Sequence, residues 1–132
     1  MKKIIFVFSF LVCLMSNVQA QKATNLTFMN NKTDSLDLSL QENMTEIPMQ
    51  VFQYKQLKYL NLSLNDLNSL PKEIGQLKNL VYLDLSLNNF AILPKEIAKL
   101  KKLKILDLRK TRISDVEILK VTKMLPKCEI KI

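Results

Sequence analysis

The 132-residue sequence contains no histidine, no tryptophan and a single glycine, Gly75. Without histidine, the chain cannot build Ser-His-Asp or Cys-His nucleophilic centres or an HExxH zinc site. With one glycine, it lacks the glycine-rich loops that hold phosphates or dinucleotides. These absences exclude the commonest catalytic classes. We therefore expect a protein that is not an enzyme and that binds no metal or cofactor.

Long apolar stretches are scarce, and the one present lies at the amino terminus. Lys2 and Lys3 precede an uncharged apolar run from Ile4 to Met15, and a short polar segment leads from this run to Ala20. A basic start, an apolar run and a small residue at the end are typical of a secretory signal peptide. We predict a signal peptide at residues 1–20, cleaved after Ala20. The mature chain would be secreted, periplasmic or held in the cell envelope.

Two alternatives to cleavage remain open. The apolar run could anchor the chain in a membrane, although its twelve residues are fewer than the roughly 20 that a spanning helix requires. Cys13 could be a lipidation site, although it lies inside the run rather than at its end. With the signal peptide removed, we expect a chain that does not span a membrane.

Cysteine is rare as well, and only Cys128 would remain after removal of the signal peptide. A single cysteine cannot form a disulfide within the chain, so stability has to come from a packed core. We interpret Cys128 as a small apolar residue of the last segment. A reactive or intermolecular thiol is the alternative.

Acidic residues are outnumbered by basic ones, so the formal net charge is +8, and +6 without Lys2 and Lys3. Basic residues gather in an eighteen-residue window that contains Lys95, Lys99, Lys101, Lys102, Lys104, Arg109, Lys110 and Arg112. Such a surface ordinarily keeps a protein soluble, and binding of a polyanion, a glycan or an anionic cell surface is the functional alternative. No aromatic residues alternate with these lysines, so we expect no nucleic-acid partner.

Leucine is abundant, and it recurs with a fixed period. The segment LKYLNLSLNDLNSLPKEIGQLKN (57–79) matches LVYLDLSLNNFAILPKEIAKLKK (80–102) with a shift of 23 residues, and a third copy begins at Leu103. The shared frame is L-x-x-L-x-L-x-x-N-x-L, with Asn65 and Asn88 in the asparagine position. A fixed period of this length indicates stacked units that cannot fold singly.

Each repeat is expected to contain a short strand and a short helical return. Apolar and polar residues alternate in Leu60-Asn61-Leu62 and Leu83-Asp84-Leu85, which predicts strands with their leucines on one side. Pro71 stands at a predicted first helical position and is followed by apolar residues at helical spacing. This order predicts one or two turns of helix or 3₁₀-helix.

These motifs resemble leucine-rich repeat proteins over roughly residues 34–132. The LPKEI segments at 70–74 and 93–97 are similar to the short bacterial class with the pattern LPxEIxxLxxL. The resemblance implies an α/β solenoid of about four repeats plus caps, with a short curved parallel sheet on its concave face and 3₁₀ or short helical return arms. It also implies a secreted bacterial recognition module but names no ligand. The protein partner that we expect, at a host or cell surface, is inferred from the concave face described below.

Capping segments are expected at both ends of the array. The predicted divisions are an N-terminal cap at 21–35 and repeats at 36–113, namely an irregular repeat at 36–56, regular repeats at 57–79 and 80–102, and a partial repeat at 103–113. The irregular repeat requires one extra residue between Leu40 and Met44. Residues 114–132 predict a C-terminal cap. An amphipathic helix begins with the capping box at Ser114 and runs to about Leu125, with one side formed by Val116, Leu119, Lys120, Lys123 and Met124, and a last strand follows.

The outward positions of the predicted strands form rows across the concave face. The predicted partner-binding residues are Tyr59, Asn61, Ser63, Leu64, Tyr82, Asp84, Ser86, Leu87, Ile105, Asp107 and Arg109, with Leu40 as a further candidate. A contiguous apolar patch with aromatic members indicates a partner. The structural alternative is that the tyrosines stack on each other and the leucines fold beneath the turns.

Two further hypotheses concern charged groups. Asp84 and Asp107 fall on neighbouring strands, about 4.8 Å apart, and such a pair resembles the carboxylates of a retaining glycosidase or the start of a hard-cation site. An open strand surface offers no deep pocket, so a carboxylate-dependent glycan hydrolase is a remote alternative. The second hypothesis places polyanion or anionic cell-surface binding on the convex face, at a basic patch of Lys99, Lys101, Lys102 and Lys104.

Overall fold

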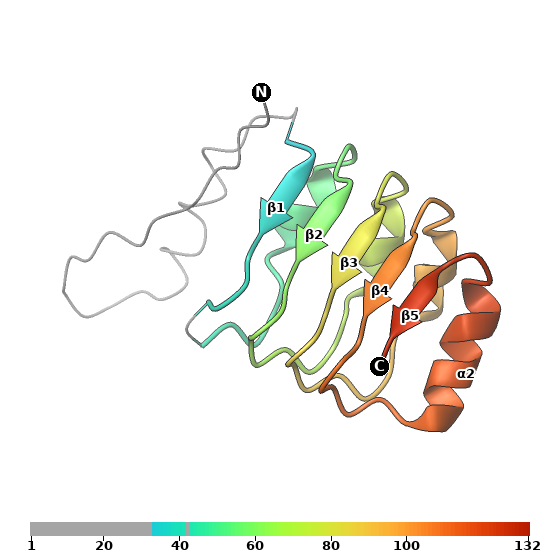
Figure 1. Ribbon diagram of the computed structural model, residues 1–132. Helices are drawn as coiled ribbons and strands as arrows, with labels where there is room; N and C mark the ends of the chain where they lie inside the picture. The colour runs from blue at the N-terminus through green and yellow to red at the C-terminus, as the bar shows by residue number, and fades with distance from the viewer. Residues whose placement is uncertain (1–32, 42) are drawn as a thin grey trace.

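The computed structural model describes residues 33–41 and 43–132, so the predicted signal peptide, Cys13 and most of the predicted N-terminal cap lie outside the described residues. Five parallel strands form one sheet in chain order, with the return arms behind it (Figure 1). The strands are β1 (Ser35–Asp37), β2 (Tyr59–Asn61), β3 (Tyr82–Asp84), β4 (Ile105–Asp107) and β5 (Glu129–Lys131), and the arms contain η1 (Met49–Gln53), η2 (Lys72–Gln76), η3 (Lys95–Lys99) and α2 (Asp115–Met124). The predicted α/β solenoid is confirmed.

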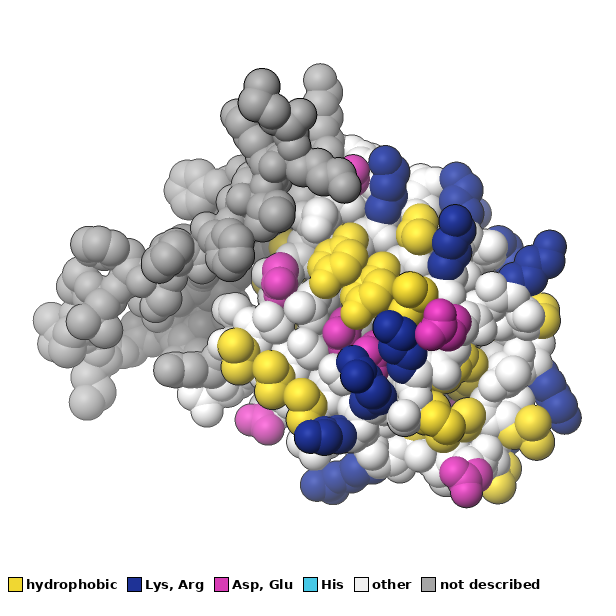
Figure 2. Space-filling view, in the orientation of Figure 1, with side chains coloured by type: hydrophobic (Ala, Val, Ile, Leu, Met, Phe, Trp, Pro, Cys, Tyr) yellow, Lys and Arg dark blue, Asp and Glu magenta, His cyan; other side chains and the backbone are white. Residues whose placement is uncertain are grey.

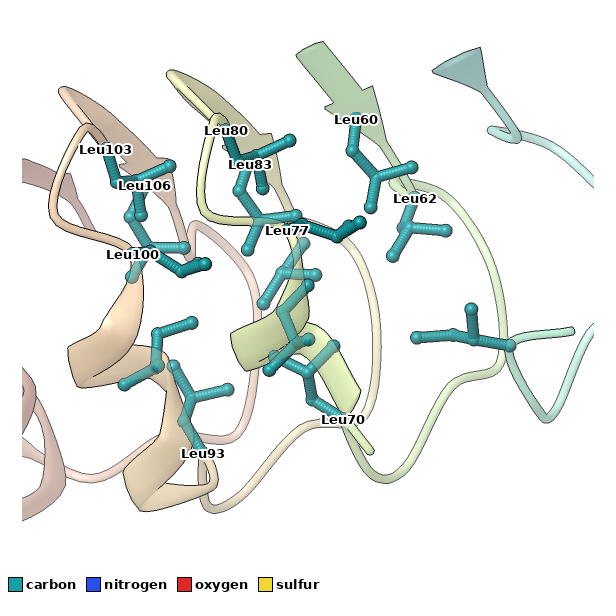
Figure 3. Close-up of a cluster of buried hydrophobic side chains, with 14 of the residues drawn as sticks. Leu60, Leu62, Leu70, Leu77, Leu80, Leu83, Leu93, Leu100, Leu103 and Leu106 are labelled. Carbon is teal, nitrogen blue, oxygen red and sulfur yellow. The ribbon is translucent and has the colours of Figure 1, made fainter. Parts of the chain in front are cut away.

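The core lies between the sheet and the arms. Parallel pairing places Leu60 beside Leu83 and Leu83 beside Leu106, and none of the three side chains is exposed. Leucines of the arms meet them from the other side (Figure 3). Because every repeat contributes the same set, the core is one continuous leucine stack rather than a separate cluster in each repeat.

Three of the return arms, η1, η2 and η3, are five-residue 3₁₀-helices, as the sequence predicts. Pro71 and Pro94 do not occupy the first helical position, which corrects that detail: each precedes the arm with extended backbone, at φ −62°, ψ 149° and φ −68°, ψ 145°. Proline suits this position because its ring fixes φ near these values and it has no N–H to leave unpaired.

The asparagine position joins one repeat to the next. The buried Asn88 side chain donates to the carbonyl oxygens of Leu62, Leu85 and Ser86 at 2.8–3.1 Å and accepts from the Leu67 N–H at 3.1 Å. Asn65 donates to the corresponding carbonyl oxygens one repeat earlier, those of Leu38, Leu62 and Ser63, but accepts from the Gln41 N–H at 2.8 Å. A buried backbone group without a partner is costly, so these amides stabilise the turn that follows each strand.

The extra residue predicted in the first repeat is confirmed. Leu40 donates to the Ser63 carbonyl as Leu64 does to that of Ser86, which aligns Leu40 with Leu64, 24 residues later. Asp66 donates to the Met44 carbonyl as Asn89 does to that of Leu67, which aligns Met44 with Leu67, only 23 residues later. The insertion therefore lies between Leu40 and Met44.

The C-terminal segment contains the predicted helix and strand. Ser114 caps α2 by accepting from the Glu117 N–H at 3.4 Å, and β5 pairs with β4. The predicted apolar side of α2 is wrong at Val116 and Leu119, which are exposed, whereas Met124 packs against the core as predicted and Val121 faces the core instead. The helix is rotated so that Val121, together with Leu125 beyond its end, packs inward.

The single glycine marks the closest approach between two arms. A Cβ built on Gly75 would lie 2.9 Å from the carbonyl oxygen of Glu96 in the next arm. Only a residue without a side chain fits between η2 and η3 at this distance. Among the described residues, no helix has the length and hydropathy needed to cross a bilayer.

Candidate functional site

The outward side of the strands, here called the sheet face, brings together all the predicted partner-binding residues. Figure 2 views this face and shows apolar side chains over the middle strands and again as a row beneath the strand ends. The side chains at the same outward position of successive strands lie in rows, because the pairing is parallel and in register. Three predicted members are nevertheless buried within this face: Ser63, Ser86 and Asp107. Their side chains support the surface and do not present themselves to a partner.

Two tyrosines form a flat platform over β2 and β3. The rings of Tyr59 and Tyr82 stack with centroids 4.6 Å apart and planes 7° from parallel. Both rings are half-buried. Burial, and secondarily the nearby carboxylate and hydrogen bond of Asp84, raises the pKa of Tyr82 to about 12. Both phenols are therefore neutral at physiological pH, and the predicted stacking occurs while part of each ring still meets solvent.

The acidic and amide row has a structural explanation. The Oδ1 atoms of Asp37, Asn61, Asp84 and Asp107 each accept a hydrogen bond from the backbone N–H two residues later, at 2.9–3.1 Å. Such a bond turns the chain at the end of a strand. A residue with a short side-chain carbonyl is required at each of these positions, whatever the protein binds.

Asp107 is committed to an ion pair. Its Oδ2 accepts from Arg109 Nη2 at 2.7 Å and its Oδ1 accepts from Arg109 Nε at 3.0 Å. Burial alone would raise the pKa of Asp107, but the hydrogen bonds and charge of Arg109 outweigh burial and hold the pKa below its usual value. A glycosidase acid needs a raised pKa and an accessible oxygen. Asp107, which is buried and has a lowered pKa, therefore lacks the properties of the acid in such a pair.

The described residues give no support to a metal site on this face. No group of three or more His, Cys, Asp or Glu side chains lies together anywhere in residues 33–41 and 43–132. The possible seed for a hard cation at Asp84 and Asp107 instead contains the guanidinium of Arg109.

A row of leucines lies where the strands end. Leu40, Leu64 and Leu87, here called the leucine ridge, have φ values of 54–56°, in the left-handed region. Their N–H groups donate to carbonyls of the next repeat, which holds this conformation in register. Lys110 continues the row with φ 54°. The exposed fractions are 69% for Leu40, 43% for Leu64 and 39% for Leu87, so the leucines do not fold beneath the turns.

The fold gains little from leucine at these positions. A left-handed conformation costs a non-glycine residue about 1–2 kcal/mol. Full burial of a leucine side chain stabilises by about 1.5–3 kcal/mol, and these side chains obtain a third to about three-fifths of that. The two contributions nearly cancel. Asparagine would adopt the same backbone with less strain, so folding alone does not account for three leucines.

Cys128 is the free cysteine of the described residues, and it packs against the core at the C-terminal end. Burial raises the pKa of its thiol to about 11. Because the thiolate is the reactive form, a raised pKa favours the interpretation as a packing residue over the interpretation as a reactive thiol.

Three of the four members of the predicted basic patch belong to a longer lysine rim at the opposite ends of the strands. Lys101, Lys102 and Lys104 lie in the loop before β4, and Lys99 lies on η3. The loops before the other strands add exposed lysines, so that the lysine rim, as we define it, comprises Lys55, Lys58, Lys78, Lys101, Lys102, Lys104 and Lys127. Prediction from one eighteen-residue window missed four of these, although each precedes a strand and the repeat period could have identified them.

Comparison with known proteins agrees with the geometry. A family model described as a leucine-rich repeat region matches residues 36–129. No curated protein matches the chain.

Solved structures give further matches. A leucine-rich repeat protein of Leptospira interrogans is 47% identical, with a TM-score of 0.72, over 75% of this chain and 25% of its own. An internalin of Listeria monocytogenes is 23% identical, with a TM-score of 0.58, over 68% and 25%. The functional domain of a second Listeria monocytogenes internalin is 24% identical, with a TM-score of 0.60, over 76% and 20%. The two internalins show the fold alone. The chain thus spans a quarter or less of these proteins.

Proposed function

Because this chain belongs to the leucine-rich repeat family, whose repeats commonly form protein-interaction modules, we propose that it is an exported, non-catalytic module that binds a protein partner through the sheet face. The partner-binding surface combines the tyrosine platform, Tyr59 and Tyr82, with the leucine ridge. Ile105 extends the platform onto β4.

The observation that carries the proposal is the exposure of apolar groups that the fold does not need. The core is complete without the ridge, and the leucines are strained as well as partly exposed. Exposed apolar and aromatic groups gathered on one face of a domain are typical of an interaction site. Tyrosine is also enriched among the residues that dominate binding energy.

A comparative capture experiment tests this surface. The tagged chain is incubated with solubilised surface proteins of the cells that surround its source, cross-linked, and its partners are identified by mass spectrometry. Tyr82→Ala and Leu87→Asn should each weaken binding of the identified partner by about 2 kcal/mol or more. Ile92→Asn is the matched control, because Ile92 is 68% exposed but lies in the return segment. Equal loss in the control would place the site elsewhere.

The lysine rim supports a second candidate, binding of a polyanion or anionic cell surface. Seven exposed lysines line one edge, and Asp34 pairs with only one of them, Lys58, at 3.4 Å. Binding at this rim would weaken steeply with salt and would be lost on replacement of Lys101, Lys102 and Lys104 by glutamine. Binding at the sheet face would depend on Tyr82 and resist moderate salt.

Export is tested separately. N-terminal sequencing of the protein recovered from its native cell should begin at Gln21 if the predicted signal peptide is removed. A retained Met1, or a lipid on Cys13, would contradict this part of the proposal.

A further inference from the structure

The leucine ridge ends in a basic pocket. Ser86, Leu87, Arg109 and Lys110 line a shallow pocket of about 190 Å³ at the end of the ridge nearest β4. One wall is therefore apolar and the opposite wall cationic. Figure 2 shows dark blue side chains where the row of apolar side chains ends.

The charge of this pocket comes mainly from Lys110. Asp107 neutralises Arg109 by sharing two hydrogen-bonded oxygens with its guanidinium. Lys110 is exposed and makes no ion pair within residues 33–41 and 43–132. A carboxylate entering the pocket would meet the Lys110 ammonium and the exposed part of the Arg109 guanidinium, which retains N–H donors beyond those bound to Asp107.

The other end of the ridge carries the opposite charge. Asp37, the last residue of β1 and three residues before Leu40, is exposed, and no ion pair neutralises it among the described residues. The ridge thus has an acidic end at β1 and a basic end at β4. Successive members lie about 4.8 Å apart, so four positions extend over roughly 14 Å. Four or five residues of extended chain span that length.

We propose that the partner presents a short segment of apolar side chains with an acidic residue at one end, and that this acidic residue occupies the pocket of Arg109 and Lys110 while the apolar side chains lie along the leucine ridge. This inference rests on the proposed function and specifies the partner's chemistry and direction. The acidic end faces β4 because Asp37 repels it at β1. A uniformly charged polymer does not fit, since three successive ridge positions offer it only hydrocarbon.

The probe that tests the proposal is a displayed library of random twelve-residue peptides, selected on the immobilised whole chain. The same library is depleted in parallel on the double variant Leu64→Asn, Leu87→Asn. Enriched peptides should share two or more apolar residues with Asp or Glu at one end of the apolar stretch. For the best synthesised peptide, fluorescence anisotropy should give a Kd at least 10-fold weaker with the double variant and with Lys110→Gln.

A charge exchange supplies the sharper control. The peptide with its acid changed to lysine should bind the wild-type chain at least 10-fold more weakly and should recover binding to Lys110→Glu. The double variant should unfold at the same temperature as the wild type or higher, because asparagine accepts the left-handed backbone. If the double variant unfolds earlier, Lys110→Gln, which alters only an exposed side chain, decides the outcome.

Different failures have different meanings. Enriched peptides that need the leucines but show no preference for an acid would overturn this inference and leave the proposed function standing. Peptides that bind the double variant equally well, or the absence of any enriched peptide, would overturn this inference too. In both of these cases the capture experiment with Tyr82→Ala still decides whether the sheet face binds a protein.

Discussion

The two sides of the sheet differ in how far they change from one repeat to the next. On the core side, the same position carries Leu60, Leu83 and Leu106, all without exposed surface. On the outward side, positions in the same register carry Tyr59, Tyr82 and Ile105 in one row and Leu64, Leu87 and Lys110 in another. Packing restricts this inner position to leucine on β2, β3 and β4, whereas the outer positions of the same strands are free to differ. The residues chosen there are therefore the better guide to binding.

The largest effect is expected on the core side. Leu83→Ala should lower the free energy of unfolding by about 2–5 kcal/mol, because it opens a cavity in the continuous leucine stack. Denaturant unfolding measures this loss. Ile92→Ala, at an exposed position, is the control and should change stability by less than about 0.5 kcal/mol. A small effect of Leu83→Ala would mean that neighbouring repeats fold independently of this stack.

The second-largest effect on stability is expected at the buried asparagine positions. Asn88→Ala removes the amide that serves three carbonyl oxygens and one N–H of two repeats, and we expect a loss of about 2–3 kcal/mol, since an unsatisfied buried group costs about 1–3 kcal/mol. Asn68→Ala is the matched control, because Asn68 is exposed and bonds only to the Asp66 carbonyl. Equal losses would contradict a special role for the buried ladder.

A substitution at the contact between η2 and η3 should lower the free energy of unfolding by a smaller amount. Gly75→Ala adds a methyl group that would lie 2.9 Å from the Glu96 carbonyl oxygen. Crowding of this kind costs about 1–3 kcal/mol, partly offset by the 0.4–1 kcal/mol or so that alanine gains by restricting the unfolded chain. Thermal unfolding should show a net destabilisation. A rise in stability would mean that η2 and η3 can separate without cost.

The repeat frame made most of this architecture predictable from the sequence. Alternating leucines predict the strands, the proline and the apolar spacing predict the 3₁₀ arms, and the misaligned first repeat predicts its insertion. The rotation of α2 was not predictable, because Val116, Leu119 and Val121 are all apolar and the choice among them depends on contacts with the core.

The outward side was predictable in position but not in conformation. Leucine disfavours a left-handed backbone, so nothing local in the sequence marks Leu64 or Leu87 for it. Hydrogen bonds from the next repeat impose it. The ion pair of Asp107 also forms only in the folded sheet, where the Arg109 guanidinium donates hydrogen bonds to the Asp107 carboxylate. The repeat period therefore predicts which residues share a row on the outward side. Backbone strain and side-chain burial within a row depend on contacts between neighbouring strands, which the sequence alone does not show.

The ion pair on the outward side should show itself through pH. The folded-state pKa of Asp107 lies below its usual value, so the pair contributes stability above the ordinary carboxyl pKa of about 3.9 and loses it as the pH falls toward the folded-state pKa. Arg109→Gln should therefore be less stable than the wild type at pH 7, and this difference should shrink below about pH 4. Urea unfolding at both pH values measures it. A difference that does not depend on pH would mean that the pair is not formed.

The smallest effect is expected for the leucine ridge itself. Leu87→Asn should change the free energy of unfolding by less than about 1 kcal/mol, because relief of backbone strain offsets the lost burial. Leu85→Asn, two residues earlier and fully buried, should by contrast prevent stable folding. Circular dichroism during heating distinguishes the two. If both substitutions unfold the domain, the two sides of the sheet do not differ in the way we infer.

The hydrogen bonds of the ridge reach only one repeat forward, and this gives the surface a simple route of evolutionary change. Each leucine N–H bonds to a carbonyl of the next repeat, so an in-frame duplication of one 23-residue unit would insert a strand and a ridge leucine while preserving the contacts on both sides. The site would lengthen in steps of about 4.8 Å. Duplication of a unit would thus extend the ridge to fit a partner with a longer apolar segment, without any change in the existing binding residues.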